Sequence, residues 1–207
     1  MEKAEVQLQQ VKSSQTNIKD FIKNNRSILG LFTALVILSI YFVIFAPNFA
    51  TTTNMIDILR QMSMIAIISI GMTFIIITGE IDLSVGSLVA ASSAIFGYLV
   101  VIMGVNMWLA FPITLVVGAI SGFVVAFLRN KYAVPSFITT LGLLSIWRGV
   151  AYLITDGSPI SPFPESFSFL GSGFIGPIPV SVFIMVILFA VFYYVMRKTT
   201  FGRYVYA

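Results

Sequence analysis

The sequence from residue 63 to residue 104 reads SMIAIISIGMTFIIITGEIDLSVGSLVAASSAIFGYLVVIMG. It consists of two apolar runs on either side of the polar stretch GEIDLSVGS, residues 79 to 87, which carries the carboxylates Glu80 and Asp82. Since about 20 apolar residues cross a bilayer as a helix, each run is close to the length of one membrane span. The stretch therefore predicts two membrane helices joined by a short polar connection.

The composition of the whole chain is that of a membrane protein. Of its 207 residues, 58% are hydrophobic and 10% are charged, and the mean hydropathy is +0.99; in soluble domains about a quarter of the residues are charged. The chain contains no cysteine and no histidine, which excludes disulfides, thiolate nucleophiles, imidazole bases and the common zinc sites. We predict neither catalytic residues nor metal ligands. The formal net charge of +4 comes from dispersed basic residues, so nucleic acid is not an expected partner.

The same length rule predicts an all-α polytopic membrane protein with about six transmembrane helices. The predicted spans are 28–46, 62–78, 85–103, 107–128, 136–154 and 178–196. The first is longer than the apolar core of a signal peptide and is expected to be retained. Together the spans form a predicted bundle over 28–196, preceded by a tail over 1–27 that forms either an interfacial helix or a solvated segment.

Two further segments complete the predicted organisation. The loop 156–177 is expected outside the cytoplasmic membrane and is rich in proline and glycine. It is either an ordered surface loop that contacts the membrane or a partner protein, or it is a simple connector. The last segment, 197–207, follows the sixth span and carries three basic residues.

The basic residues predict the orientation of the chain. Ten of the twelve Lys and Arg residues lie before the first span, between the fourth and fifth spans, or after the sixth. An even number of spans brings these places to one side, which the positive-inside rule assigns to the cytoplasm. Both termini are therefore expected in the cytoplasm. The exceptions are Arg60, just before the second span, and Arg148, near the outer end of the fifth, whose long side chains can reach the interface.

The polar stretch GEIDLSVGS has two interpretations. In the first, it is a hairpin at the cytoplasmic interface, where Gly79 and Gly86 allow a tight turn and Asp82 or Ser84 caps the third span. In the second, the helix is interrupted between Gly79 and Gly86 at depth, and the two carboxylates line a solvated pathway. Two charges in mid-membrane cost about 2.5 to 3.5 kcal/mol each on insertion scales. The cost favours the interfacial hairpin and leaves the pathway open as an alternative.

Four stretches of the chain together resemble one known family. GMTFIIITGEIDLSVGSLVA (71–90) is similar to the signature segment of the permease subunits of bacterial ABC importers of the ribose, xylose and arabinose type. The resemblance continues, in the family's order, in NMIDILRQMS (54–63), VPSFITTLGLLSIWRGVAYLIT (134–155) and TTFGRYVYA (199–207). Members of that family continue beyond the FGR segment, so the chain resembles the N-terminal part of a permease bundle.

The resemblance implies a function and a set of partners. A second permease subunit, identical or homologous, forms the translocation path with this one, and an extracytoplasmic binding protein delivers the sugar. A separate ABC ATPase uses ATP and Mg²⁺, and this chain, which has no G-x-x-x-x-G-K-[ST] run, binds no cofactor of its own. The protein is then a multi-pass component of the bacterial cytoplasmic membrane and not itself an enzyme.

The resemblance and the polarity of the chain also suggest site residues. The ATPase contact of the family begins at FGR, which corresponds here to Phe201, Gly202, Arg203 and Tyr204. The candidate substrate-pathway residues are Glu80, Asp82, Ser84, Gly86, Asn54, Thr73 and Thr140. For the hydroxyl groups among them, hydrogen bonds to the helix's own carbonyls are the commoner role.

Two other functions remain open from the residues alone. Intramembrane carboxylates also occur in ion-coupled secondary transporters, where Glu80 or Asp82 would carry a proton or sodium ion. A truncated membrane fragment that does not transport is the third interpretation.

Overall fold

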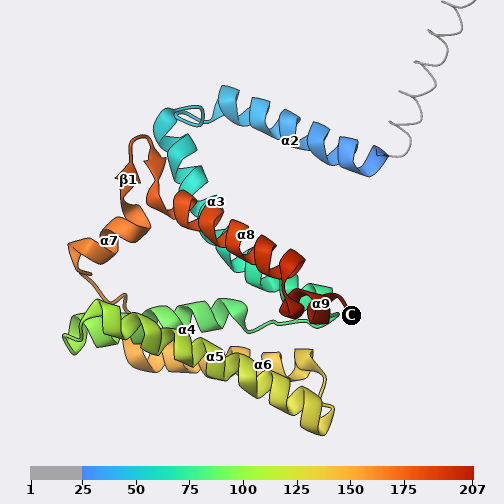
Figure 1. The fold of residues 1–207 in the computed structure, drawn as a ribbon. Coiled ribbons are helices and arrows are strands. Elements are labelled where there is room, and N and C mark those ends of the chain that lie inside the picture. Colours follow the sequence, from blue (N-terminus) through green and yellow to red (C-terminus); the bar gives the residue numbers. More distant parts are fainter. Residues whose placement is uncertain (1–24) are drawn as a thin grey trace, which may run out of the picture. The chain divides into compact units, whose positions relative to one another are not determined.

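The computed structural model describes residues 25–207 of the chain (Figure 1). Residues 1–24 of the predicted tail over 1–27 lie outside the described residues, and so does most of the expected interfacial helix. The chain divides into two compact units, Met1–Met55 and Ile56–Ala207, which we describe separately.

Six helices in the described part of the chain are long and apolar enough to cross a membrane. They are α2 (Arg26–Phe45), α3 (Thr52–Ile77), α4 (Val85–Gly97) with its π-helical continuation η1 (Tyr98–Ile102), α5 (Met107–Tyr132), α6 (Ser136–Thr155) and α8 (Val180–Lys198). Shorter elements are α7 (Glu165–Ser172), α9 (Thr200–Tyr206) and the strands β1 (Phe174–Ile175) and β2 (Ile178–Pro179). The prediction of an all-α polytopic membrane protein is confirmed.

The helix that contains the second predicted span begins before that span. The helix α3 starts at Thr52, whereas the apolar pattern alone placed its start at 62. Its first turns are polar, but the Thr51 hydroxyl accepts a hydrogen bond from the Asn54 amide, 3.3 Å away, and supports the helix start. Arg60 therefore lies within α3 and not before it.

Two other helix ends differ from the predicted bounds for local reasons. The helix α5 continues past 128 to Tyr132, with Arg129 and Lys131 in its last turn, where cations interact favourably with the helix dipole. The helix α8 begins at Val180 because the two residues before it form β2.

The first unit contains α2 and the turn that follows it. Every residue of α2 is at least partly exposed within the chain, although most of its side chains are apolar. A helix with apolar residues on all sides is stable when lipid or other protein surrounds it. The unit therefore has the surface of a membrane helix.

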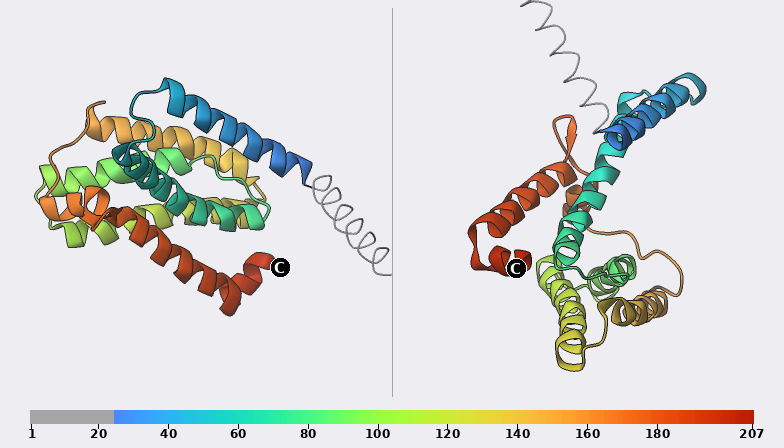
Figure 2. Two further views of the ribbon diagram at one scale, coloured as in Figure 1. Left: turned by 90° about the horizontal axis from the view of Figure 1, so that it is seen from above. Right: turned by 90° about the vertical axis from the view of Figure 1, so that its right-hand side faces the viewer.

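In the second unit, α4 packs along α6 and α5 (Figure 2). Small residues allow this close approach, since Ala91 and Ala94 are buried in α4. Farther along, Phe96, Val100 and Ala110 form a buried cluster at the end where η1 leads into α5. The small residues of the third predicted span thus serve helix packing.

The loop predicted on the outside contains regular secondary structure. It contains α7 and an antiparallel hairpin in which Phe174 pairs with Pro179 and Ile175 with Ile178. Phe163 and Phe167 pack on Phe96 of α4, with ring centroids 6.1 and 4.5 Å from it. We call residues 156–179 the outer segment, after the side of the membrane on which the sequence predicts it.

Candidate functional site

The polar connection between α3 and α4 is a short irregular loop. The helix α3 ends at Ile77 and α4 begins at Val85, so the helical run is broken close to the predicted interruption between Gly79 and Gly86, a break that both interpretations of this stretch contain. Gly79 has φ +75°, in the left-handed region that glycine adopts at little cost, so it makes the turn. Contrary to the prediction, Gly86 takes no part in the turn. It lies inside α4 with open space beside it.

Two hydroxyl groups of α6 hold this loop at its centre. The Ile81 amide donates to the Ser136 hydroxyl at 3.3 Å, and the Thr140 hydroxyl, 3.4 Å from the Ile81 carbonyl oxygen, donates to it. Thr140 is completely buried and its hydroxyl also lies 3.2 Å from the Phe137 carbonyl oxygen. Because both polar groups of Ile81 are satisfied by α6, the loop is tied to the first turns of that helix.

An ion pair adds a third attachment, to α5. The Arg129 guanidinium donates from Nε to Oε1 of Glu80 at 2.8 Å. The two side chains are 48% and 30% exposed respectively, so water screens the pair in part. A hydrogen bond from Ser136 and the one from Arg129 hold the pKa of Glu80 below its ordinary value of 4.5, and Glu80 is ionised at neutral pH. We call Glu80, Ile81, Arg129, Ser136 and Thr140 the inner clasp.

We expect the stability difference between the wild type and Glu80→Gln to disappear in acid. The folded chain has the lower pKa at Glu80, so between that value and 4.5 the unfolded chain binds more protons and stability rises with pH. The wild type should therefore unfold at the higher temperature at neutral pH, and the two should converge as pH falls through the folded pKa. Circular dichroism in detergent between about pH 3 and pH 7 measures this. A difference that does not narrow as the pH falls would contradict the assignment.

Asp82 and Ser84 make a different contact from the one expected. Asp82 Oδ1 accepts hydrogen bonds from both the amide and the hydroxyl of Ser84, each at 2.7 Å. Ser84 occupies the N-cap position of α4, but its hydroxyl donates to Asp82 instead of accepting from a first-turn amide. The expected side-chain cap of the third span is therefore wrong; the two residues form an Asx turn that leads the chain into α4.

A pocket of about 220 Å³ lies against the inner clasp. Its lining residues are Gly79, Glu80, Ile81, Arg129, Pro135, Ser136 and Phe137. Glu80 thus comes together with Arg129 and Ser136, two residues that were not predicted as site residues. One signal in the sequence could have indicated the ion pair. Glu80 and Arg129 have opposite charges and lie at connections that are predicted on the same side of the membrane.

The other candidate pathway residues lie elsewhere. Asn54 belongs to the first unit, where its side-chain amide donates to the Phe49 carbonyl oxygen at 2.7 Å. The Thr73 hydroxyl donates to the Ser69 carbonyl oxygen at 2.7 Å, the helix back-bonding that is usual for threonine. Thr73 also borders two largely apolar pockets between α3 and α8, of about 150 and 340 Å³.

The FGR segment forms a helical corner at the end of α8. The Thr199 hydroxyl accepts from the Gly202 amide at 3.5 Å and starts α9. Gly202 is buried against the backbone of Met196, and the ring of Phe201 lies 6.5 Å from that of Phe74 on α3. Arg203 and Tyr204 are exposed. Of the four candidate coupling residues, Gly202 is therefore buried, Phe201 is exposed but contacts the ring of Phe74, and Arg203 and Tyr204 are exposed.

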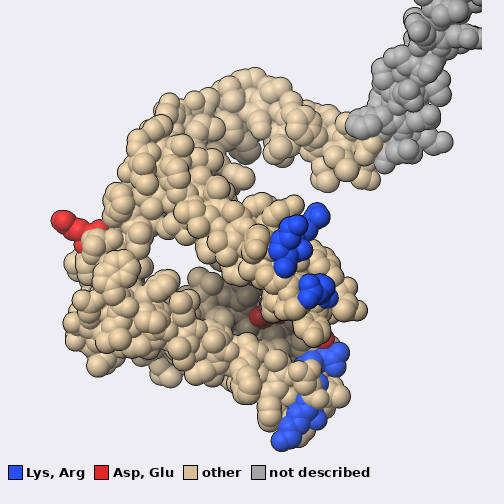
Figure 3. Space-filling view, in the orientation of Figure 1, with Lys and Arg blue, Asp and Glu red and all other residues tan. Residues whose placement is uncertain are grey.

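Basic side chains gather at the same end of the second unit as the inner clasp. Figure 3 shows Lys and Arg over the final turns of α5 and over the region of α8 and α9. These are Arg129 and Lys131 in the last turn of α5, Arg197 and Lys198 in that of α8, and Arg203 in α9.

Six apolar helices in a chain of this composition define a polytopic membrane protein. Residues 54–207 match the family described as branched-chain amino acid transport system / permease component. The chain therefore belongs to this family of transport permeases, as the resemblance to permease subunits of bacterial ABC sugar importers indicated.

Several relatives are named as ribose permeases. The ribose import permease protein RbsC of Haemophilus influenzae is 38% identical over 199 residues, and that of Escherichia coli K12 is 37% identical over 193. RbsC of Bacillus subtilis is 38% identical over 181 residues. These alignments cover 94%, 91% and 86% of this chain, and 60%, 59% and 56% of the respective relatives. The chain thus spans a little under two thirds of the length of these relatives. No solved structure matches it.

Proposed function

We propose that the chain is a permease subunit of an ATP-driven ABC importer that carries a monosaccharide such as ribose or xylose across the bacterial cytoplasmic membrane. The observation that carries this proposal is the similarity of most of the chain to permeases named for ribose import. The chain lacks a P-loop sequence, so the proposal assigns ATP hydrolysis to a separate ABC ATPase. An extracytoplasmic sugar-binding protein and a second permease subunit complete the assembly.

The proposed placement puts the inner clasp at the cytoplasmic interface. With 26 residues, α3 is about 39 Å long, more than the hydrocarbon thickness of about 30 Å. A helix of this length can cross the membrane fully before it reaches the loop that carries Glu80. The partner of Glu80, Arg129, lies in the last turn of α5, on the side to which the positive-inside rule assigns the cytoplasm. This placement supports the interfacial hairpin, with the N-terminus in the cytoplasm.

The inner clasp is then the proposed inner end of the sugar pathway. A neutral sugar needs hydrogen-bond donors and acceptors in place of water, and the pocket beside the clasp offers the carboxylate of Glu80, the guanidinium of Arg129 and the hydroxyl of Ser136. The same groups bind one another in this structure. Opening of the inner end would therefore exchange these internal bonds for bonds to the sugar and to water, with no covalent step.

The helical corner of α8 and α9 is the proposed ATPase contact. Arg203 and Tyr204 are exposed on α9, and the packing of Gly202 on α8 fixes how α9 is presented. A movement imposed on α9 would reach α3 through Phe201 and Phe74.

Ion coupling through Glu80 is the weaker alternative. A proton carrier needs a pKa near the working pH, whereas hydrogen bonds to Ser136 and Arg129 lower that of Glu80 below 4.5. Asp82 is engaged by Ser84 at 2.7 Å. These contacts favour structural roles for the two carboxylates over the binding of a transported ion.

Uptake of radiolabelled D-ribose tests the proposal. We expect cells that express this chain with an ATPase and a binding protein encoded beside its gene to take up ribose, or xylose in a parallel assay, only while ATP is present. Cells lacking this chain alone are the control. Uptake that survives ATP depletion and collapses with an uncoupler would support ion coupling instead. Equal uptake with and without the chain would support a fragment that does not transport.

A further inference from the structure

Arg60 is a charged residue in an apolar helix that bonds to a distant segment. It lies on α3 about 12 Å from the helix start, and its side chain is 25% exposed. Its NH1 lies 3.6 Å from Asp57, its NH2 donates to the Ser172 carbonyl oxygen at 3.5 Å, and its guanidinium lies 5.1 Å from the centre of the Phe174 ring. Two of these three contacts belong to the outer segment, more than 100 residues away in the sequence.

The packing around Arg60 fixes its position. Within the described residues its Nε is buried and has no hydrogen-bond partner, an arrangement that costs free energy and persists only where other contacts hold the side chain. The planar guanidinium is suited to this, because it can lie over an aromatic ring and donate from its edge at the same time. The contact with the outer segment is therefore specific to arginine.

A second contact joins α3 to the other end of the hairpin. Ser63, one turn after Arg60, donates to the Arg60 carbonyl oxygen at 2.7 Å, and its buried hydroxyl lies 2.8 Å from that of Ser181 at the start of α8. Between the two contacts the chain folds tightly at Gly173, where a Cβ atom would collide with the ring and carbonyl oxygen of Phe169. We call Arg60, Ser63 and their contacts with Ser172, Phe174 and Ser181 the outer clamp.

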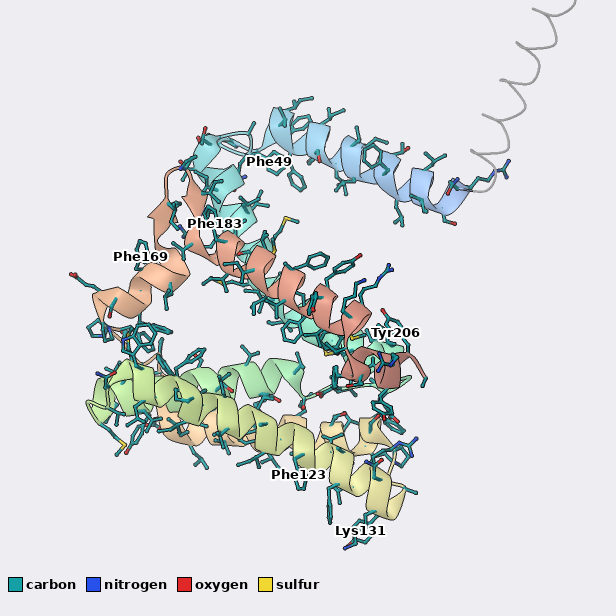
Figure 4. The ribbon with its side chains drawn as sticks, in the orientation of Figure 1. Phe49, Phe123, Lys131, Phe169, Phe183 and Tyr206 are labelled. Carbon is teal, nitrogen blue, oxygen red and sulfur yellow. The ribbon has the colours of Figure 1, made fainter. Side chains whose placement is uncertain are left out.

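The outer segment is also attached to the α4 side of the unit. Phe163 and Phe167 pack on Phe96, and the Ser166 hydroxyl lies 3.4 Å from the sulfur of Met107 at the start of α5. On α7, between these attachments and the outer clamp, Phe169 and Leu170 remain exposed; Figure 4 labels Phe169 on this helix. A displacement of α7 would therefore be transmitted to both α3 and α4.

We propose that Arg60 is a positioning residue that passes a displacement of α7 to α3. The inference rests on the proposed function, in which a sugar-loaded binding protein docks on the outer face and must trigger the ATPase on the opposite face. The helix α3 is the continuous connection, since it carries the outer clamp near one end and stops at Ile77, just before the inner clasp. Without Arg60, α7 can move while α3 stays in place.

The first test is the stimulation of ATP hydrolysis by the binding protein in the assembled transporter. We expect Arg60→Gln to reduce the ratio of stimulated to basal hydrolysis at least about fivefold, the lower end of the usual coupling between two sites. Basal hydrolysis and the amount of folded protein should stay close to those of the wild type. Arg60→Lys should restore part of the stimulation, because it keeps the charge but not the planar fork. Wild-type stimulation in Arg60→Gln would overturn the proposal.

Arg148→Gln is the matched control. Like Arg60, Arg148 is an arginine in a long apolar helix, toward its predicted outer end, but it is exposed and makes neither an ion pair nor a side-chain hydrogen bond within residues 25–207. Its substitution should leave the stimulation unchanged. A wild-type assembly without any ATPase activity would contradict the proposed function rather than the role of Arg60.

A second measurement needs no partner protein. The chain has no cysteine, so spin labels can be placed at Ile76→Cys on α3 and Leu170→Cys on α7, both exposed positions. We expect Arg60→Gln to broaden the distance distribution between the labels, and Arg148→Gln to leave it unchanged. If Arg60→Gln does not fold, Phe174→Leu removes the ring under the guanidinium and should produce the same broadening. An unchanged distribution in the folded variant would overturn the proposal.

Discussion

Replacing Gly202 by alanine is expected to weaken the association of the chain with its proposed ATPase partner at least about tenfold, which corresponds to about 1.4 kcal/mol. A Cβ atom at this position would collide with the carbonyl oxygen of Met196 and lie 2.7 Å from its Cα atom. Both are backbone atoms, so the clash is relieved only if α9 leaves its place on α8. Titration of the ATPase against the purified variant in detergent measures the effect. An affinity equal to that of the wild type would contradict it.

Two further variants test whether the expected loss of affinity comes from the corner between α8 and α9. Gly142→Ala changes a helical glycine of α6 that has open space beside it, so it should fold and bind the ATPase as the wild type does. Arg203→Ala removes an exposed side chain and leaves the corner intact. If Arg203→Ala also weakens association while the amount of inserted protein is unchanged, then α9 itself is the contact surface.

Reversing the charge of Arg129 is expected to abolish most of the sugar uptake proposed for the chain. In Arg129→Glu a second carboxylate faces Glu80 across a contact that now measures 2.8 Å, and the inner clasp loses its attachment to α5. Neutral Arg129→Gln should have a smaller effect, since ion pairs exposed to this extent contribute about 0.2 to 1 kcal/mol. Initial rates of ribose uptake at matched expression compare the variants.

Exchanging the two charges tests whether the loss of uptake in Arg129→Glu comes from the broken ion pair. The double variant Glu80→Arg with Arg129→Glu restores an attraction and should recover a measurable part of the uptake that Arg129→Glu loses. Lys131→Glu is the control with the same change of charge, two residues farther along α5. The Lys131 ammonium lies over the rings of Phe127 and Tyr132, and Figure 4 shows it at the tip of the helix. A loss of uptake in Lys131→Glu as large as in Arg129→Glu would indicate a general effect of charge.

The apolar runs were sufficient to predict the six long helices, because hydropathy over about 20 residues is the dominant constraint on a membrane chain. They could not predict where a helix continues through polar residues. The start of α3 at Thr52 depends on a hydroxyl cap at Thr51, and the end of α5 at Tyr132 on basic residues that suit a helix C-terminus. Local hydrogen bonds and the helix dipole determine these ends, and neither is visible in hydropathy.

The candidate site was predicted in part. Glu80 stood out as a carboxylate between two spans, and Thr140 as a hydroxyl in the fifth span; the structure joins both to the same loop. Arg129 and Ser136 were missed because their partners are about 50 residues distant in the sequence. Such a pairing follows only from the folded arrangement of α4, α5 and α6.

The unequal lengths of α3 and α4 have a consequence for the lipid around them. With 26 residues α3 is about 39 Å long, whereas the 18 residues from Val85 to Ile102 extend at most about 27 Å. A hydrocarbon layer of about 30 Å is therefore shorter than the first, whose polar first turns can lie in the interface, and longer than the second, which must stand nearly upright. Since one short loop connects the two helices, longer acyl chains in the bilayer would stretch the layer beyond the reach of α4 and pull on the inner clasp.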